Sequence, residues 1–129
     1  MILFPLLYNF RNFFNQILIV AHCEIVSLNE RLRFLRYDPG QKFEPHYDGR
    51  YTRDDKIERS YITIQLYLNE GFEGGGTTFL DRKLELPSLE YVPQTGSVLV
   101  FQHDLLHEGS AVTKGRKYTL RTDVMYKPC

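Results

Sequence analysis

The sequence has no excess of charge of either sign, and it has very little cysteine. Its 16 basic residues are balanced by 16 acidic residues, so it lacks the positive charge that phosphate contacts with a nucleic acid require. Its two cysteines, Cys23 and Cys129, lie far apart, which excludes a disulfide framework and a C-x-x-C metal knuckle. We therefore expect no nucleic-acid partner, and the redox compartment stays open.

The sequence also lacks an uninterrupted hydrophobic run of membrane-spanning length. Residues 1–20 are rich in apolar side chains, but five polar ones interrupt them: Asn9, Arg11, Asn12, Asn15 and Gln16. A basic start and a small-residue cleavage site, which mark a signal peptide, are not evident either. We therefore expect no membrane span, and the lack of an evident signal peptide favours a cytoplasmic location.

The apolar residues of this first segment recur at three- and four-residue spacing, which is typical of an amphipathic helix. They are Leu6, Leu7, Phe10, Phe13, Phe14, Ile17 and Leu18. The pattern predicts a helix packed on a sheet. We accordingly divide the chain into an N-terminal helical support segment, residues 1–26, and a domain of residues 27–129.

The remainder of the chain consists of short alternating runs separated by turn-forming residues, and 43% hydrophobic residues suffice for one core. The runs are residues 32–37, 61–69, 77–80, 90–92, 97–102 and 117–126. Short strands at this spacing predict a mainly β sandwich or barrel. In residues 61–69 the aliphatic side chains share one face and Thr63, Gln65, Tyr67 and Asn69 share the other, which suits either solvent or an internal site.

A His-x-Asp pair, His46 and Asp48, lies in "FEPHYDG". Residues two apart on a strand point the same way, so the pair can offer one nitrogen and one oxygen to a single cation. His103 and His107 are the candidates for a third ligand, whereas His22 is better explained as a packing or surface residue. Two histidines and one carboxylate with open positions are the arrangement of non-haem Fe(II) oxygenases.

Four segments in order, from about Leu28 to Tyr126, carry a resemblance to a known family. They are "LRYDPGQKFEPHYDG", "LYLNEGFEGGGTTF", "PQTGSVLVFQHDLLHEG" and "GRKYTLRTDVMY". They resemble the prolyl 4-hydroxylase-like group of 2-oxoglutarate- and Fe(II)-dependent dioxygenases. The resemblance implies a double-stranded β-helix, which is a jelly-roll, cupin-like barrel. It also implies hydroxylation of a prolyl residue in a peptide or protein, with Fe(II), 2-oxoglutarate, O2 and ascorbate as cofactors and with succinate and CO2 as products.

The same resemblance implies roles for particular residues. It assigns His46, Asp48 and His107 as the catalytic iron ligands, and Lys117, ten positions beyond His107, as the partner of the far carboxylate of 2-oxoglutarate. An ammonium group inside a partly dry barrel needs such a partner, which agrees with this assignment.

Three further residues complete the predicted cosubstrate site. Tyr37 and Tyr67 match positions where the family places tyrosines near the cosubstrate, and each is also explained as an aromatic residue filling the barrel. Arg121 shares the face of Lys117 by alternation. It can share the carboxylate, replace Lys117 as its anchor, or neutralise Asp123, and the sequence leaves these alternatives open.

The loops of the predicted domain carry weaker signals. The glycines at 74–76 indicate a tight turn with positive φ, and we expect Thr77 near the site. The charged loop 49–60 is a candidate lid, and it and loop 81–88 are where substrate selectivity would arise. Two rival functions stay open: a cupin-like metal protein without oxygenase activity, and an inactive family member that serves as a peptide-binding module.

Overall fold

The structure is a computed structural model that describes residues 23–83 and 85–127. These residues form strands β1 (Ile25–Leu28), β2 (Arg33–Tyr37), β3 (Phe43–His46), β4 (Arg59–Tyr67), β5 (Glu73–Gly74), β6 (Thr77–Phe79), β7 (Leu89–Tyr91), β8 (Val98–Gln102), β9 (His107–Gly109), β10 (Val112–Lys114) and β11 (Lys117–Tyr126). The helix predicted for the first segment lies outside the described residues. Strand β1 straddles the boundary expected at residue 26, and the division of the chain there stays a prediction.

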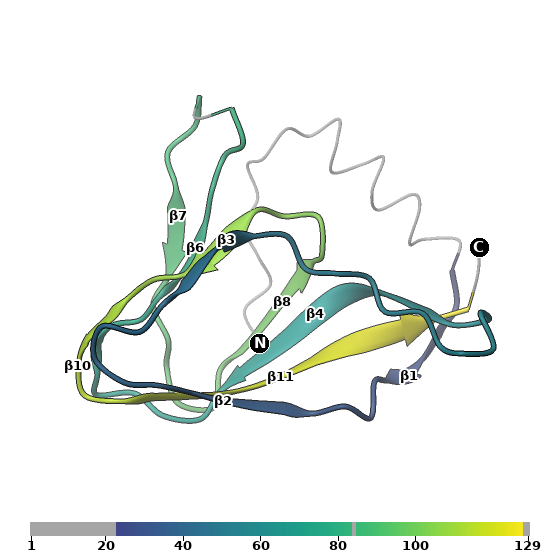
Figure 1. Ribbon diagram of the computed structural model, residues 1–129, viewed down its shortest axis with the longest axis horizontal. Helices are drawn as coiled ribbons and strands as arrows, with labels where there is room; N and C mark the ends of the chain where they lie inside the picture. The colour runs from purple at the N-terminus through teal and green to yellow at the C-terminus, as the bar shows by residue number, and fades with distance from the viewer. Residues whose placement is uncertain (1–22, 84, 128–129) are drawn as a thin grey trace.

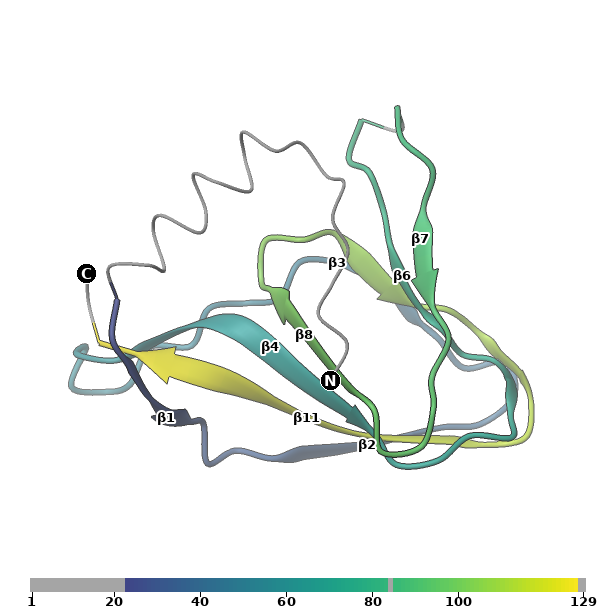
Figure 2. The ribbon, with the colours of Figure 1, turned by 180° about the vertical axis from the view of Figure 1, so that it is seen from behind.

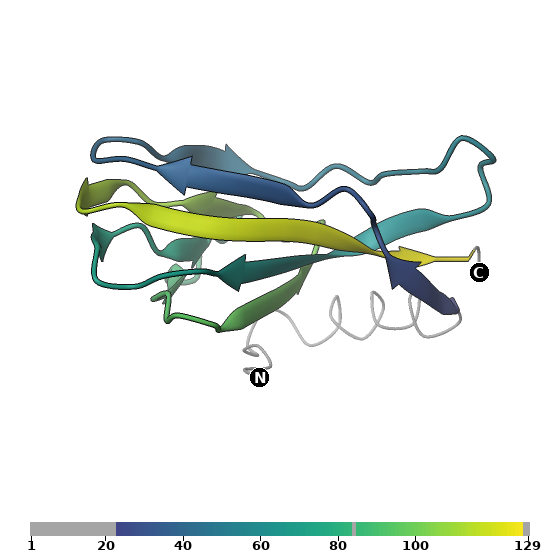
Figure 3. The ribbon, with the colours of Figure 1, turned by 90° about the horizontal axis from the view of Figure 1, so that it is seen from below.

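The largest sheet is built around the two longest strands, β4 and β11. Its order is β1-β11-β4-β8, and β2 also pairs with β11. Strand β2 pairs with the first half of β11 and β1 with its end, all in antiparallel register. Figure 3 shows β2, β11, β4 and β8 lying side by side. The long alternating runs of the sequence therefore form one continuous sheet.

A second sheet, with the order β3-β9-β6-β7, faces the first, and a β10–β5 ribbon lies at one end of the barrel (Figures 1 and 2). Every strand pairing in both sheets and in the ribbon is antiparallel. Two facing antiparallel sheets joined in this way form the jelly-roll barrel that the sequence predicts. The prediction of a mainly β, double-stranded β-helix is confirmed. Among the described residues, no helix is long and apolar enough to span a membrane.

The polar face of β4 points into the barrel and not to solvent, the two alternatives that the sequence left open. Thr63 and Tyr67 have no exposed surface, whereas Leu68 on the aliphatic face is 39% exposed. The polar face of β4 therefore lines the inside of the barrel. A small apolar cluster also lies in the interior. It consists of Tyr67, Leu99 and Phe101, against which Phe79, Tyr91 and Leu105 pack.

Candidate functional site

Three of the predicted site residues converge at the second sheet. His46 ends β3 and His107 begins β9, and the two lie opposite each other in the antiparallel register. Asp48 lies two residues beyond His46, where its backbone N–H donates to the carbonyl of His103 at 2.9 Å. One potential ligand atom from each of His46, Asp48 and His107 lies within 4.8 Å of the others. His103 is not part of this group.

The hydrogen bonds of the two imidazoles fix which ring nitrogen is free. His46 Nδ1 lies 2.7 Å from the carbonyl oxygen of Glu44, and His107 Nδ1 lies 2.9 Å from that of Leu105. A carbonyl oxygen only accepts, so both Nδ1 atoms carry the hydrogen and both Nε2 atoms present a lone pair. This is the tautomer in which histidine binds a metal through Nε2.

The two Nε2 lone pairs face one carboxylate oxygen. His46 Nε2 and His107 Nε2 lie 3.4 and 3.7 Å from Asp48 Oδ1. This oxygen is buried and makes no well-aligned hydrogen bond, its one close ionic contact being a guanidinium nitrogen of Arg121, so it remains available as a ligand for a cation placed between the three atoms. Burial lowers the pKa of His107, which favours the neutral imidazole that a metal requires. The residues present therefore fit a divalent cation.

The other contacts of Asp48 come from the first sheet. Thr63 Oγ1 donates to Asp48 Oδ2 at 2.5 Å, and a nitrogen of the Arg121 guanidinium lies 2.8 Å from Oδ1. Thr63 holds the oxygen that faces away from the histidines, whereas Arg121 contacts the oxygen that faces them. The sequence placed Thr63 on a polar face of its strand but gave no reason to connect it with Asp48.

Lys117 lies apart from these three residues, buried at the start of β11. Its ammonium donates to the carbonyl of Gly75 at 2.6 Å and lies over the rings of Tyr37 and Tyr67, at 5.2 and 5.7 Å from the ring centroids. Burial lowers its pKa from the ordinary value to about 8. A protonated lysine has three donors, and the structure shows one of them bonded within the protein, so the others can serve a ligand carboxylate.

Hydroxyl groups line the barrel beside Lys117. The Tyr67 hydroxyl pairs with Thr77 Oγ1 at 2.6 Å, and burial raises the pKa of Tyr67 above its ordinary value. Thr119 Oγ1 and the Tyr91 hydroxyl are buried without a hydrogen-bond partner. The Tyr91 ring lies 5.4 Å from the ring of Tyr67, which Lys117 also approaches, and buried unpaired hydroxyls in a region that also holds an ammonium suit a polar, anionic ligand. Thr119 is the residue that alternation from Lys117 could have identified.

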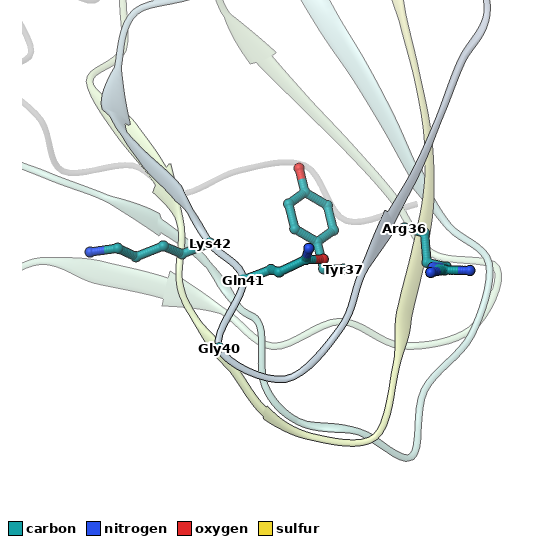
Figure 4. Close-up of a pocket in the computed structure, with 5 residues that line it drawn as sticks. All are labelled: Arg36, Tyr37, Gly40, Gln41 and Lys42. Carbon is teal, nitrogen blue, oxygen red and sulfur yellow. The ribbon is translucent and has the colours of Figure 1, made fainter.

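Tyr37 approaches Lys117 from β2, where the two residues are register partners. It also lines an open hollow with Arg36, Gly40, Gln41 and Lys42 (Figure 4). The cationic residues of this hollow, Arg36 and Lys42, point to opposite sides, and they pair with the half-buried Asp38 and the exposed Glu44 respectively. Their charges are compensated at the surface. The tyrosine ring, whose pKa burial raises, is the part of this region that reaches toward Lys117.

Arg121 lies next to the candidate metal ligands, and its charge also acts on Tyr37. Its guanidinium pairs with Asp48 at 2.8 Å and lies 3.8 Å from Asp123 Oδ1, which in turn is 3.4 Å from His103 Nε2. Of the alternatives for Arg121, the structure thus favours carboxylate pairing within the protein over anchoring a cosubstrate. The sequence offered His103 as an alternative third ligand and Asp123 as a partner of Arg121, and the structure pairs both residues with this side of the site.

The glycine-rich turn contributes directly to the pocket. Gly74 and Gly75 have φ values of 73° and 70°, as predicted, whereas Gly76 is not in that region. This backbone orients the Gly75 carbonyl toward Lys117, so the turn that sequence reasoning took as structural supplies an acceptor to the site.

The charged loop 49–60, the candidate lid, is held by ion pairs of Arg53. Arg53 pairs with Glu58 at 2.6 Å and with Glu30 at 2.8 Å.

Comparisons with known proteins define the class of protein to which this fold and site belong. A family model described as the 2OG-Fe(II) oxygenase superfamily matches residues 32–122. The chain belongs to this family, and its resemblance to prolyl 4-hydroxylases is confirmed by its relatives. One relative from Arabidopsis thaliana, named "Probable prolyl 4-hydroxylase 10", is 31% identical over 121 residues, which cover 73% of this chain and 41% of the relative.

Two solved structures show the same fold. An oxidoreductase of the 2OG-Fe(II) oxygenase family from Burkholderia pseudomallei superposes with a TM-score of 0.62 at 17% identity, covering 81% of this chain and 46% of that one. The viral collagen prolyl hydroxylase of Paramecium Bursaria Chlorella virus-1, in its 2OG complex, gives a TM-score of 0.57 at 26% identity, covering 89% of this chain and 68% of that one. The chain spans less than half the length of the Arabidopsis relative described above.

Proposed function

We propose that this protein is a 2-oxoglutarate- and Fe(II)-dependent dioxygenase that hydroxylates a prolyl residue of a peptide or protein. The observation that carries the proposal is the convergence of potential ligand atoms of His46, Asp48 and His107 to within 4.8 Å of one another at a buried carboxylate. Membership of the family supports the iron and the cosubstrate. The more specific part of the proposal, the prolyl substrate, is supported by the names of the relatives.

Three residues would hold the metal, and a different set would hold the cosubstrate. His46 and His107 offer Nε2 and Asp48 offers Oδ1, which leaves further positions on the metal for other ligands. Bound Fe(II) with 2-oxoglutarate and O2 supplies the oxidising chemistry, in which 2-oxoglutarate is decarboxylated to succinate and the substrate receives a hydroxyl group. Ascorbate belongs to the proposal as the reductant that the family resemblance implies.

The protein's own part in the reaction is binding, orientation and exclusion of water. Lys117 would give a charge-assisted hydrogen bond to the far carboxylate of 2-oxoglutarate, between the rings of Tyr37 and Tyr67. Those rings limit access of water and keep the ammonium in a medium where its charge acts strongly. Thr119 Oγ1, which is buried and unpaired, can supply a further hydrogen bond to the same ligand.

The two rival functions make different predictions for the same site. A cupin-like metal protein would bind the metal through the two histidines and Asp48 but would gain nothing from Lys117. An inactive peptide-binding module would need neither. The buried ammonium favours the dioxygenase over both, because among its described contacts it has a carbonyl and two aromatic rings but no opposite charge, and an anionic ligand would supply one.

The first experiment is an anaerobic titration of the Fe(II)-loaded protein with 2-oxoglutarate, in which the weak visible charge-transfer band of the chelate is recorded. We expect a band in the wild type and its loss in both His107→Ala and Lys117→Ala. The Lys114→Ala variant is the matched control, because Lys114 pairs with Glu73 at the exposed surface. The absence of a band from folded, iron-loaded wild-type protein would rule out the dioxygenase.

Substrate class needs a separate measurement, since the band reports only on the cosubstrate. We expect peptides that contain proline to increase succinate formation and to gain 16 Da. Matched peptides with alanine in place of proline should do neither. Turnover of both peptides alike would contradict the prolyl assignment while leaving the dioxygenase intact.

A further inference from the structure

The carboxylate oxygen that faces both histidines is also the one that Arg121 contacts. A guanidinium nitrogen lies 2.8 Å from Asp48 Oδ1, and the two side chains are only 14% and 1% exposed. The other carboxylate oxygen is already bonded to Thr63. A cation held by His46, Asp48 and His107 would therefore share its oxygen ligand with a permanent positive charge.

Arg121 belongs to a buried polar cluster whose hydrogen bonds are incomplete. Asp48 Oδ1, Arg121 Nε, Asp123 Oδ1 and both ring nitrogens of His103 are buried without a hydrogen-bond partner among the described residues. Buried polar atoms are normally paired, so a group of unpaired ones around a single guanidinium requires an explanation. The cluster is held together mainly by charge, through the pairs of Arg121 with Asp48 and with Asp123.

We propose that Arg121 is the internal counter-ion of Asp48 in the metal-free protein, and that it weakens the binding of divalent cations at the site. The inference rests on the metal site of the proposed function. In the metal-free state the guanidinium compensates a carboxylate that would otherwise be buried alone, at a large cost. When a cation arrives, the same guanidinium repels it, because charges a few ångströms apart in a partly buried site are poorly screened.

The sign of this effect separates Arg121 from the usual outer partners of metal ligands. Groups that accept a hydrogen from a ligating histidine, as Glu44 and Leu105 do here through their carbonyls, strengthen metal binding. Arg121 instead partly neutralises the negative charge of Asp48 Oδ1, the oxygen that would bind the metal. Asp123, 3.8 Å from the guanidinium, offers Arg121 a second carboxylate when the metal takes up Asp48 Oδ1. The arginine can therefore stay buried in both states.

The test compares Mn(II) affinity and thermal stability in the wild type and two glutamine variants. Arg121→Gln removes the buried guanidinium, and Arg116→Gln removes an arginine that pairs with Asp38 at the surface. The Mn(II) dissociation constant comes from the electron paramagnetic resonance signal of free Mn(II), and the midpoint of thermal unfolding is measured with chelator and with saturating Mn(II).

We expect Arg121→Gln to bind Mn(II) at least about tenfold more tightly than the wild type, with Arg116→Gln within about twofold. Arg121→Gln should lose more stability without metal than with it, so that Mn(II) raises its unfolding midpoint further than that of the wild type. A purely structural role for Arg121 would lower both midpoints equally. Equal losses, or Mn(II) binding that is unchanged or weaker, would overturn the inference.

Two further variants keep the test decisive. If Arg121→Gln does not fold even with Mn(II), the double variant Asp48→Asn with Arg121→Gln is the next test, because it removes both charges. Folding of the double variant supports the counter-ion, and its failure to fold contradicts it.

His46→Ala separates this inference from the proposed function. If His46→Ala and the wild type bind Mn(II) equally well, the metal site itself is wrong. If they differ and Arg121→Gln binds no more tightly, the site stands and the counter-ion is wrong.

Discussion

Lys117 donates a hydrogen bond of 2.6 Å to the carbonyl of Gly75, and this bond joins the start of β11 to the glycine-rich turn. The carbonyl bears no full charge, so it compensates the buried ammonium only in part. Burial accordingly lowers the pKa of Lys117 to about 8. The residue is therefore protonated at neutral pH but loses its proton within a range of pH that a binding experiment can reach.

The affinity for 2-oxoglutarate should depend on pH through this lysine. Below about pH 8 the ammonium is present and affinity is constant; above it the free protein loses the proton that the ligand carboxylate needs, and the dissociation constant should rise about tenfold per pH unit. Calorimetry on the Mn(II)-loaded protein between about pH 7 and 9 checks this. Lys117→Arg should abolish the dependence, because a guanidinium stays protonated. A flat profile in the wild type would contradict the role of Lys117.

The glycine-rich turn should tolerate alanine very unevenly. Gly74 and Gly75 both have positive φ, but a Cβ on Gly74 would meet the backbone carbonyl oxygen of Ala111, whereas one on Gly75 would meet side chains of Phe72 and Val112 at 3.0 and 3.1 Å. We expect Gly75→Ala to lower the free energy of unfolding by about 1 kcal/mol and Gly74→Ala by more than about 2 kcal/mol. Urea denaturation measures both.

Gly40→Ala is the control for these variants. Gly40 has a φ of 85° with no atom within 4 Å of the added Cβ, so its substitution reports the backbone strain alone. We expect it to cost about 1 kcal/mol. If Gly74→Ala cost no more than Gly40→Ala, the close packing of the turn against β10 would be refuted.

The long strands are the part of this fold that sequence alone could predict. Alternation over many residues locates β4 and β11 to within two residues, because a strand with one buried face must repeat with period two. The strands β1, β3, β5, β9 and β10 have only two to four residues, too few to show a period. They exist because neighbouring strands offer them hydrogen bonds, which is a property of the assembled barrel.

The candidate site likewise has a part that the sequence could predict and a part that only the assembled barrel reveals. Alternation placed Thr63 on the polar face of β4, and Lys117 and Arg121 on one face of β11. It could not say whether these faces met solvent or another sheet. His46 and Asp48 do converge, although not as two residues of one strand: β3 ends at His46, and Asp48 is placed by its bond to the His103 carbonyl. The contact of Arg121 with Asp48 crosses the barrel and left no signal in the sequence.

Thr63 should hold Asp48 in the orientation that presents Oδ1 to the histidines. It donates a hydrogen bond to Oδ2 at 2.5 Å, and without it the carboxylate is held only at Oδ1, by Arg121. We expect Thr63→Val to weaken Mn(II) binding by about 10- to 100-fold, as loss of an outer-shell partner does, and Thr63→Ser to restore it. Thr122→Val is the control, since it removes a comparable bond, to the Asn29 carbonyl. Equal effects of the two valine variants would show that Thr63 acts through general stability.

Asp81 should organise the turn that follows β6, where we predicted substrate selectivity. Its carboxylate is buried and accepts the backbone N–H groups of Lys83, Glu85 and Leu86 at 2.9 to 3.1 Å. Alanine at this position leaves all three donors without their acceptor, so we expect their amide hydrogens to exchange at least about tenfold faster in Asp81→Ala.

Asp55→Ala is the matched control for Asp81→Ala, because Asp55 accepts a single amide, that of Ile57, in the exposed loop 49–60. Hydrogen exchange followed by mass spectrometry or NMR reads both variants at the level of individual segments. If the turn contacts the substrate, Asp81→Ala should also raise the KM for a peptide with little change in kcat, since the iron ligands are untouched. Unchanged exchange at Lys83, Glu85 and Leu86 would mean that the turn keeps its shape without the carboxylate. A lower kcat with an unchanged KM would place the effect of Asp81 on the chemistry and remove the turn from substrate binding.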